Sequence, residues 1–259
     1  MKDRSAAIVV AGGSGTRFGS LKQFVEFFGF PVISWCIHQL VQAVDHIAVV
    51  IPPQVLQETD RETVLKTLRS LVDAVELPEP AASYFLKSLD YRYLDDGMIT
   101  IVSGGVTRSE SVRNGLSVLS QDYSVVVVHD AARPLATADL FRRVMGKIDE
   151  GYDGATCYLP VTDTVKLLED DGSLSTLDRQ KLIAVQTPQA FAPDVLRAVH
   201  SKGEEATDDI ALLEKAGAKI ALVEGEALNW KITDPDDVLL LEAVLTAKTS
   251  SSQSLKRHG

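Results

Sequence analysis

The sequence has little cysteine, no long apolar run and a shortage of basic residues. Of its 259 residues only Cys36 and Cys157 are cysteines, far apart and in no CxxC pair. That excludes a disulfide scaffold and a cysteine-based zinc site, and it suits a reducing cytoplasm, where we expect the protein to act. No apolar stretch approaches the roughly 20 residues of a membrane helix. We expect no signal peptide, because the start, Met-Lys-Asp-Arg-Ser, runs directly into a strand-like stretch.

The charge balance limits the partners. The chain carries 26 Lys and Arg against 36 Asp and Glu, a net charge of -10. Affinity for a phosphate backbone depends on clustered Lys and Arg, so we expect no nucleic-acid partner. Any anionic ligand must then be held by a few cations placed close together.

Short β-branched runs alternate with helix-like segments along the chain. The predicted strands cover residues 6–11, 46–51, 99–102, 125–129, 155–161 and 219–223. The run Val125-Val126-Val127-Val128 does not alternate with polar residues, as expected of a strand covered on both faces. The alternation predicts an α/β, Rossmann-like fold: a mostly parallel sheet with helices on both faces. Sites in such sheets lie beyond the carboxyl ends of the strands.

Three segments depart from this rhythm. Residues 160–186 hold the turn signal Asp170-Asp171-Gly172 between extended stretches, which predicts a projecting β-hairpin arm. Residues 77–97, rich in Tyr and Pro, form an insertion that is either an extra helix and loop or partly disordered. Residues 248–259, with a Thr-Ser-Ser-Ser-Gln-Ser run, are expected to be a disordered tail. The remaining 1–247 form one domain that includes the arm and the insertion.

A glycine-rich loop follows the first strand. It reads Ala11-Gly12-Gly13-Ser14-Gly15-Thr16-Arg17-Phe18-Gly19, with Lys22 shortly after. Backbone N–H groups of such a loop can surround an anion, and Arg17 and Lys22 add positive charge. A Walker loop is excluded because no Gly-Lys-Ser/Thr follows the required gap. A dinucleotide site, and with it an NAD-dependent oxidoreductase, is disfavoured by Phe18 and by a second strand that ends in Pro52-Pro53 rather than an acid. A tight turn without ligand remains the alternative.

The loop resembles the signature of nucleotidyltransferases that activate sugars and polyols. Later motifs narrow the resemblance: Gly104-Gly105-Val106-Thr107-Arg108-Ser109-Glu110-Ser111, Val128-His129-Asp130-Ala131-Ala132-Arg133-Pro134, Thr162-Asp163-Thr164-Val165-Lys166, Gln186-Thr187-Pro188-Gln189, Thr207-Asp208-Asp209 and Asn229-Trp230-Lys231. In this order, across residues 6–247, they are similar to the family of 2-C-methyl-D-erythritol 4-phosphate cytidylyltransferases.

The resemblance implies a reaction between CTP and a sugar-alcohol phosphate. A phosphate oxygen of methylerythritol phosphate attacks the α-phosphorus of CTP and pyrophosphate leaves, as part of non-mevalonate isoprenoid synthesis. A phosphate monoester is largely dianionic at neutral pH, so the nucleophile needs no general base. The site must supply positioning, positive charge and a divalent cation, expected to be Mg²⁺. By resemblance the catalytic residues are Arg17, Lys22, Arg179 and Lys231.

The CTP-binding residues implied are Ala11, Gly12, Gly13, Ser14, Gly15, Thr16, Gly105, Ser111, Asp130 and Ala131. Gly105 and Ser111 would read the pyrimidine edge, although a serine here is also a candidate helix cap. Relatives often carry an acid where Val106 stands, so no side-chain role is expected at that position. Asp130 would face the ribose and approach Mg²⁺ held mainly by the triphosphate, unless it merely caps a turn.

The substrate-binding residues implied are Asp130, Arg133, Thr164, Arg179, Thr187, Thr207, Asp208 and Lys231. In the family the arms interlock across a homodimer, so Thr164 and Arg179 would complete the partner's site, with Arg179 acting beside Lys231 of the other chain. Without the family, Arg179 reads equally well as a surface arginine. Thr207 is also a candidate N-cap for a helix over residues 208–216.

Two further interpretations stay open. A ribitol-5-phosphate cytidylyltransferase shares the glycine loop and the Gln-Thr-Pro-Gln motif, but Ala131-Ala132 and Thr207-Asp208-Asp209 favour the methylerythritol family. A non-catalytic nucleotide-binding regulatory module is disfavoured because Arg17, Lys22 and Lys231 are all retained.

Overall fold

The computed structural model of the chain describes residues 4–11, 21–70 and 97–256, with side chains as far as residue 247. The elements are β1 (Ser5–Val10), the 3-10 helix η1 (Lys22–Phe24), β2 (Glu26–Phe27), β3 (Phe30–Pro31), α1 (Val32–Leu40), β4 (His46–Ile51), α2 (Pro53–Glu58), α3 (Arg61–Arg69), β5 (Ile99–Ser103), α5 (Arg108–Val118), β6 (Val125–Asp130), α6 (Ala138–Asp149), β7 (Gly154–Pro160), β8 (Lys166–Leu168), β9 (Leu174–Thr176), η2 (Arg179–Lys181), β10 (Ile183–Phe191), α7 (Pro193–His200), α8 (Asp209–Lys215), β11 (Ile220–Glu224) and α9 (Pro235–Lys256). Residues 12–20, with Arg17, and nearly all of the predicted insertion at 77–97 lie outside the described ranges.

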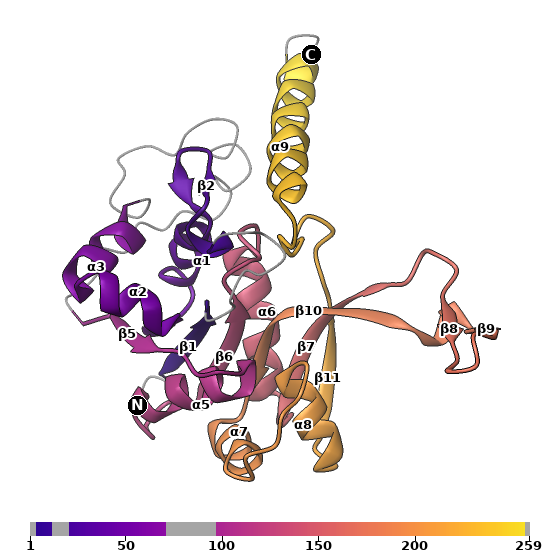
Figure 1. Ribbon diagram of the computed structural model, residues 1–259, viewed down its shortest axis with the longest axis horizontal. Helices are drawn as coiled ribbons and strands as arrows, with labels where there is room; N and C mark the ends of the chain where they lie inside the picture. The colour runs from indigo at the N-terminus through magenta and orange to yellow at the C-terminus, as the bar shows by residue number, and fades with distance from the viewer. Residues whose placement is uncertain (1–3, 12–20, 71–96, 257–259) are drawn as a thin grey trace.

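A seven-stranded sheet forms the centre of the molecule (Figure 1), with the strand order β11-β7-β10-β6-β1-β4-β5. Neighbouring strands run parallel except β10, which is antiparallel to both β6 and β7. The prediction of a mostly parallel sheet is therefore confirmed. The parallel strands β1, β4, β5 and β6 end at one edge, where Val10 pairs with Asp130 and Ile51 with Ser103.

Helices cover both faces of this sheet, as predicted. One apolar layer joins the sheet to α1, α3 and α6 through Ile33, Leu68 and Phe141. The opposite layer joins it to α5, α7 and α8 through residues that include Val112, Leu196 and Leu213. Successive side chains of a strand point to opposite faces, so Val125 and Val127 enter the first layer and Val126 and Val128 the second. The unbroken valine run is thus explained by burial on both sides.

A smaller apolar cluster joins the β2–β3 hairpin, α1 and the final helix α9. Phe27, Trp35, Leu241 and Leu245 are buried in it, and the Trp35 ring meets Phe27 edge-on at 5.4 Å. The helix continues to Lys256, so the predicted disordered tail is wrong as far as that residue. The first turn of a helix is costly to form, but each residue added to an existing helix gains a hydrogen bond without that cost, so a packed helix can extend beyond its packed part. Within the described ranges, no helix is long and apolar enough to cross a membrane.

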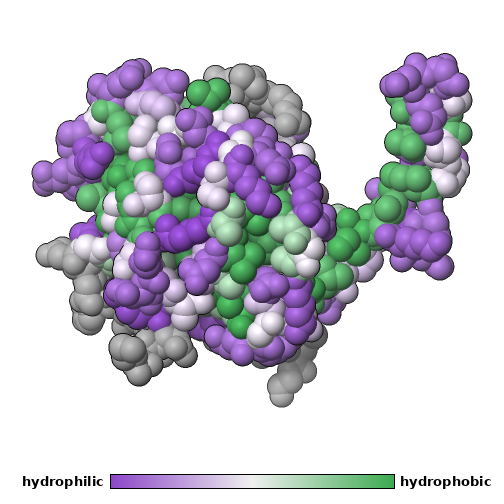
Figure 2. Space-filling model, turned by 90° about the horizontal axis from the view of Figure 1, so that it is seen from below, coloured by the Kyte–Doolittle hydropathy of each residue, from purple (hydrophilic) through white to green (hydrophobic). Residues whose placement is uncertain are grey.

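The predicted arm leaves the sheet at the ends of β7 and β10 and projects sideways (Figure 1). Its tip is the two-stranded sheet β8–β9, which turns at Gly172 with a φ of +84°. Asp-Asp-Gly suits this turn because glycine adopts positive φ without a steric penalty. Figure 2 shows hydrophobic surface running along the arm, on a segment that makes no core of its own.

Candidate active site

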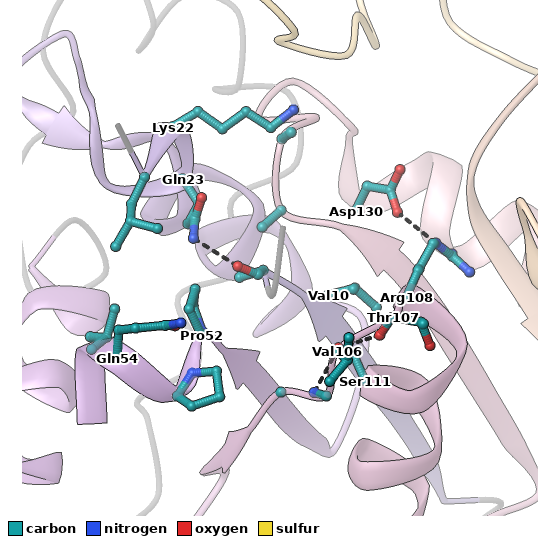
Figure 3. Close-up of a pocket in the computed structure, with 18 of the residues that line it drawn as sticks. Val10, Lys22, Gln23, Pro52, Gln54, Val106, Thr107, Arg108, Ser111 and Asp130 are labelled. Carbon is teal, nitrogen blue, oxygen red and sulfur yellow. Dashed lines mark hydrogen bonds and ion pairs between the residues drawn. The ribbon is translucent and has the colours of Figure 1, made fainter. Parts of the chain in front are cut away.

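A cleft lies where the parallel strands end (Figure 3), with a volume of about 910 Å³. It is lined by the ends of β1 and β6, the loop after β5 and the segments that begin η1, α2 and α5. The sequence-predicted site residues that line it are Ala11, Lys22, Gly105, Ser111, Asp130, Ala131 and Lys231. Residues that lie more than 200 positions apart in the chain, such as Lys22 and Lys231, therefore share one cavity.

Lys22 enters the cleft from η1. Its Nζ donates a hydrogen bond to the carbonyl oxygen of Ile232 at 2.8 Å, next to Lys231. The adjacent Gln23 is buried and donates from Nε2 to the carbonyl oxygen of Ala11 at 2.7 Å. This contact ties the segment that follows the glycine loop back to the end of β1. In Figure 3 Lys22 lies across the cavity from Thr107 and Ser111.

Asp130 is the buried acid at the end of β6. Its Oδ2 lies 2.7 Å from Lys231 Nζ, and its Oδ1 lies 3.4 Å from Arg108 Nε. Burial by itself would raise the pKa of Asp130, but Arg108 and Lys231 more than offset it and hold the pKa well below its usual range. The carboxylate is therefore ionised at every physiological pH, with one cation on each oxygen.

Arg108, the first residue of α5, was not singled out from the sequence as a functional residue. Its Nη1 lies 2.7 Å from Asp209 Oδ2, and the other oxygen of Asp209 lies 2.9 Å from His200 Nε2. Burial opposes the charge of Arg108, yet Asp209 and Asp130 raise its pKa overall. An arginine that opens a helix directly after a strand end is the signal that points to it in the sequence.

A series of hydrogen bonds through Thr187 and His129 holds the backbone of Asp130 in place at the end of β6. The Asp130 N–H donates to Thr187 Oγ1 at 3.0 Å, and Thr187 Oγ1 lies 3.2 Å from His129 Nδ1. His129 Nε2 lies 3.1 Å from the Arg133 carbonyl oxygen, which only accepts, so Nε2 carries the proton and Nδ1 accepts from Thr187. Burial lowers the pKa of His129 to about 4. The imidazole is thus a neutral structural group rather than a base facing the cleft.

Thr187 and Arg133 lie beside the cavity rather than among its lining residues. Arg133 Nη1 donates to the Asn229 carbonyl oxygen at 2.7 Å, which joins the end of β6 to the segment before Lys231. Burial lowers the pKa of Arg133. Contacts of these two side chains with a substrate stay predictions.

The loop at the start of α5 forms the other wall of the cleft. Thr107 caps the helix by accepting from the Glu110 N–H at 3.1 Å, so the serine-cap alternative for Ser111 is wrong. Ser111 Oγ instead accepts from the Gly105 N–H at 3.1 Å and donates to the Thr107 carbonyl oxygen at 2.9 Å. Glu110 Oε2 accepts from the Val106 N–H at 2.7 Å. A Cβ at Gly105 would lie 2.2 Å from Glu110 Cγ, so this close packing requires glycine.

Four predicted residues lie away from the cleft of their own chain. Thr164 and Arg179 are exposed on the arm, where Arg179 Nη1 donates to the Thr162 carbonyl oxygen at 2.7 Å. Thr207 is exposed, and it does not cap α8 as predicted, because the N-cap is the next residue, Asp208. Asp208 caps α8, because its Oδ1 accepts from the Ala211 N–H at 3.0 Å while Oδ2 accepts from Gln189 Nε2 at 2.8 Å.

The fold and the cleft define a class: α/β proteins that gather cations at the strand ends to bind phosphorylated ligands. The family model described as IspD, 2-C-methyl-D-erythritol 4-phosphate cytidylyltransferase, matches residues 85–247. A relative of that name from Rubrobacter xylanophilus is 37% identical, with 94% of this chain and 96% of the relative covered. Another from Carboxydothermus hydrogenoformans is 33% identical over 94% and 96% of the two chains. The chain belongs to the IspD family.

Solved structures agree with this assignment. The crystal structure of 4-diphosphocytidyl-2C-methyl-D-erythritol synthase from Anaerococcus prevotii superposes with a TM-score of 0.74 at 27% identity, covering 94% of this chain and 96% of that one. The 2-C-methyl-D-erythritol 4-phosphate cytidylyltransferase from Thermus thermophilus gives a TM-score of 0.67 at 29% identity, covering 94% and 98%. The Rossmann-like fold class is confirmed.

Proposed function

We propose that this protein transfers the cytidylyl group of CTP to 2-C-methyl-D-erythritol 4-phosphate, in isoprenoid precursor synthesis. The products are 4-diphosphocytidyl-2-C-methyl-D-erythritol and pyrophosphate. Beside the family membership, one observation carries the proposal: a chain with a net charge of -10 brings Lys22, Arg108 and Lys231 to one cleft at the strand ends. The lining also holds the acids Glu58, Glu110 and Asp130, so the cations are positioned one by one rather than as a net positive surface, and each can meet a phosphate of the two substrates.

The reaction requires no general base in this cleft. A phosphate oxygen of the second substrate attacks the α-phosphorus of CTP, the bond to the bridging oxygen breaks, and pyrophosphate carries away the electron pair. Because a phosphate monoester is largely dianionic near pH 7, no proton has to be removed from it. His129, the histidine nearest the acid, has a pKa of about 4 and both ring nitrogens in hydrogen bonds. Positioning and charge stabilisation are therefore the work of the site.

The two lysines divide this work. Lys22 follows the glycine loop and would neutralise charge on the α-phosphate and the leaving pyrophosphate, together with Arg17. Lys231 forms an ion pair with Asp130 and would bind the phosphate of the second substrate. The bond from Lys22 Nζ to the Ile232 carbonyl oxygen, 2.8 Å, holds the first lysine beside the segment that carries the second. In the proposed reaction the leaving phosphates would meet Lys22 and the attacking phosphate would meet Lys231.

A divalent cation, Mg²⁺, is part of the proposal. Within the described ranges no group of three or more His, Cys, Asp or Glu side chains could hold a metal ion. Mg²⁺ typically retains water and binds through one or two carboxylates plus substrate phosphates. Asp130, an ionised acid at the end of β6, fits that single-carboxylate role once Arg108 or Lys231 turns to substrate. When bound, the cation supplies further charge neutralisation for the triphosphate.

We also propose that the protein works as a homodimer through its arm. The arm exposes apolar side chains at Leu167, Leu168 and Leu174 at its tip and at Ile183 and Val185 in its stalk. Thr164 and Arg179 are remote from the cleft of their own chain, so they can serve a substrate only in the cleft of another copy. The family resemblance supports that arrangement, in which Arg179 acts beside Lys231 of the partner.

A cytoplasmic location is the remaining part of the proposal. Cys36 and Cys157 are both free and buried, and burial raises the pKa of each thiol to about 12. Thiols of this kind form no disulfide and suit a reducing compartment.

A substrate panel tests the function. Pyrophosphate release is measured with CTP, UTP, ATP and GTP, each with methylerythritol phosphate or ribitol 5-phosphate, with and without Mg²⁺. We expect turnover only when CTP, methylerythritol phosphate and the metal are present together. Equal or faster turnover with ribitol 5-phosphate would show that methylerythritol phosphate is not the preferred substrate. Binding of CTP without any product would indicate a regulatory module.

A further inference from the structure

Lys231 and Arg108, the two cations that contact Asp130, belong to a longer row of charged and polar groups that starts in the cleft and ends in the protein interior. Starting in the cleft, Lys231 Nζ lies 2.7 Å from Asp130 Oδ2, and Arg108 Nε lies 3.4 Å from Asp130 Oδ1. The row continues from Arg108 Nη1 to Asp209 Oδ2 at 2.7 Å and from Asp209 Oδ1 to His200 Nε2 at 2.9 Å. It therefore crosses from the cleft, past α5, to the end of α7 and the start of α8.

The far end of the row is the most deeply buried part. The side chains of Asp209 and His200 are only 1% and 2% exposed, whereas that of Lys231 is 42% exposed. His200 Nε2 faces a carboxylate and so acts as the donor in either protonation state. His200 Nδ1 has no hydrogen-bond partner among the described residues. Among the described residues, Asp209 is therefore the hydrogen-bond partner that the His200 ring serves.

The distances show how Arg108 is shared between its two acids. The contact to Asp209 is short, and the contact to Asp130 is at the long end of a hydrogen bond. A buried carboxylate must have its charge compensated, and His200 fixes the oxygen of Asp209 that Arg108 does not use. Held in this way, Asp209 keeps Arg108 from closing onto Asp130, which leaves the second oxygen of Asp130 to orient Lys231.

We propose that His200 is a positioning residue for the reaction, which acts through Asp209 and Arg108 to set the geometry of Asp130 and Lys231. This inference rests on the proposed function, because Asp130 and Lys231 are the groups that meet the second substrate. Without His200, Asp209 loses one partner and its hold on Arg108 weakens. Arg108 then pairs more closely with Asp130, and Lys231 is displaced. Lys22 and Gly105 are not members of the row, and of its members only Asp130 is also expected at CTP, so CTP binding should be affected less than binding of the second substrate.

Replacement of His200 by leucine tests the proposal in the full-length protein. We expect His200→Leu to lower kcat/KM for methylerythritol phosphate about tenfold or more, since small displacements of positioned groups are costly in rate. The KM for CTP should rise less than the KM for methylerythritol phosphate, because Asp130 is the only member of the row that is also expected to bind CTP. His200→Gln keeps an N–H donor near the position of Nε2 and should restore most of the loss.

Val199→Ala is the matched control, because Val199 is buried in the apolar layer on the same helix and its side chain has no polar atom that could join the row. It should lower the thermal midpoint without changing the ratio of the two substrates' kinetic constants. The proposal is overturned if His200→Leu and Val199→Ala affect kcat/KM alike, or if His200→Gln is no better than His200→Leu.

A second readout does not depend on turnover. In ¹⁵N-arginine-labelled protein the side-chain Nε–H signal of Arg108, assigned by its loss in Arg108→Lys, should shift or broaden in His200→Leu and return in His200→Gln. An unchanged signal in His200→Leu would refute the row as a positioning device even if the wild-type protein proved inactive toward methylerythritol phosphate. Wild-type inactivity with a shifted signal would refute the proposed function alone.

Discussion

The strands beside the cleft and the strands of the arm differ in how they are held. All six residues of β6 are buried, between two apolar layers, whereas every residue of β8 and β9 is exposed. The cleft side therefore takes its order from the core of its own chain. Two short strands without an apolar layer are marginal in water, so the arm needs a second surface. The difference suits the proposed dimer, in which the cleft of one chain and the arm of its partner would together form one site.

The largest expected effect comes from removing a cation of the cleft. Lys231→Ala should lower kcat by about 10²- to 10³-fold, because a fixed charge that stabilises reacting phosphates is lost and Asp130 keeps only Arg108. Steady-state pyrophosphate release measures the change. Lys181→Ala on the exposed arm is the control and should stay within about twofold. A Lys231→Ala rate within a few-fold of wild type would remove Lys231 from the mechanism.

The next effect concerns acid stability on the buried side. The pKa of His129 is lowered from 6.5 to about 4 in the folded protein, so the unfolded chain takes up its proton first as the pH falls. Stability from the neutral ring is present above pH 6.5 and is lost between pH 6.5 and about 4, by about 3 kcal/mol for this group. Asp130, whose pKa is depressed, adds a loss in the same direction at lower pH.

Urea unfolding at fixed protein concentration from pH 7 to 4.5 measures this dependence. His129→Gln should be less stable at pH 7 and show a flatter pH profile than wild type. Leu174→Ser on the exposed arm should give a profile parallel to wild type. Parallel profiles for wild type and His129→Gln would show that folding does not lower the pKa of His129.

Breaking the apolar surface of the arm should have an intermediate effect. Leu168→Asp combined with Leu174→Asp places charge on side chains that are 69% and 65% exposed in one chain, so the fold itself should persist. We expect the dimer to dissociate and the rate to fall about tenfold or more, because buried unpaired charge at an interface is costly. Analytical ultracentrifugation gives the mass. Val118→Asp, an exposed site outside the arm, should remain dimeric, and a dimeric double variant would contradict the arm interface.

The smallest expected effect distinguishes two helix caps. Thr107 and Thr137 cap α5 and α6 in the same way, each accepting from an N–H three residues on. Replacing either by alanine should cost about 1 kcal/mol of stability. Only Thr107→Ala also loosens the loop at Gly105, and its KM for CTP should rise about threefold while that of Thr137→Ala stays unchanged. Equal KM values for CTP in the two variants would show that the loop at Gly105 does not contribute to nucleotide binding.

The sequence predicted the parts of the molecule that depend on local pattern. Apolar runs covered on both faces, such as residues 125–128, and the Asp170-Asp171-Gly172 turn predict the sheet and the arm because burial and glycine conformations act over a few residues. The extension of α9 to Lys256 escaped prediction because a packed helix propagates through residues that lack helix signals of their own.

The candidate site was predictable where motifs follow strands, as at Gly105, Asp130 and Lys231. The row through Arg108, Asp209 and His200 was not. Arg108 and Asp209 are separated by 101 residues and meet only because α5, α7 and α8 cover the same face of the sheet. The capping of α8 by Asp208 rather than Thr207 likewise depends on local backbone geometry that either residue type allows. Arg17 and Gly12 to Thr16 stay predictions, because they lie outside the described residues.

Mixing two inactive variants tests most directly whether the cleft of one chain and the arm of another form one site. Arg179→Ala and Lys231→Ala chains are unfolded together, refolded and assayed for pyrophosphate release. Random pairing in a twofold dimer gives half heterodimers, each with one intact cleft facing one intact arm, so about a quarter of the wild-type activity should return. Activity that stays at the level of the separate variants would confine each site to a single chain and contradict the account.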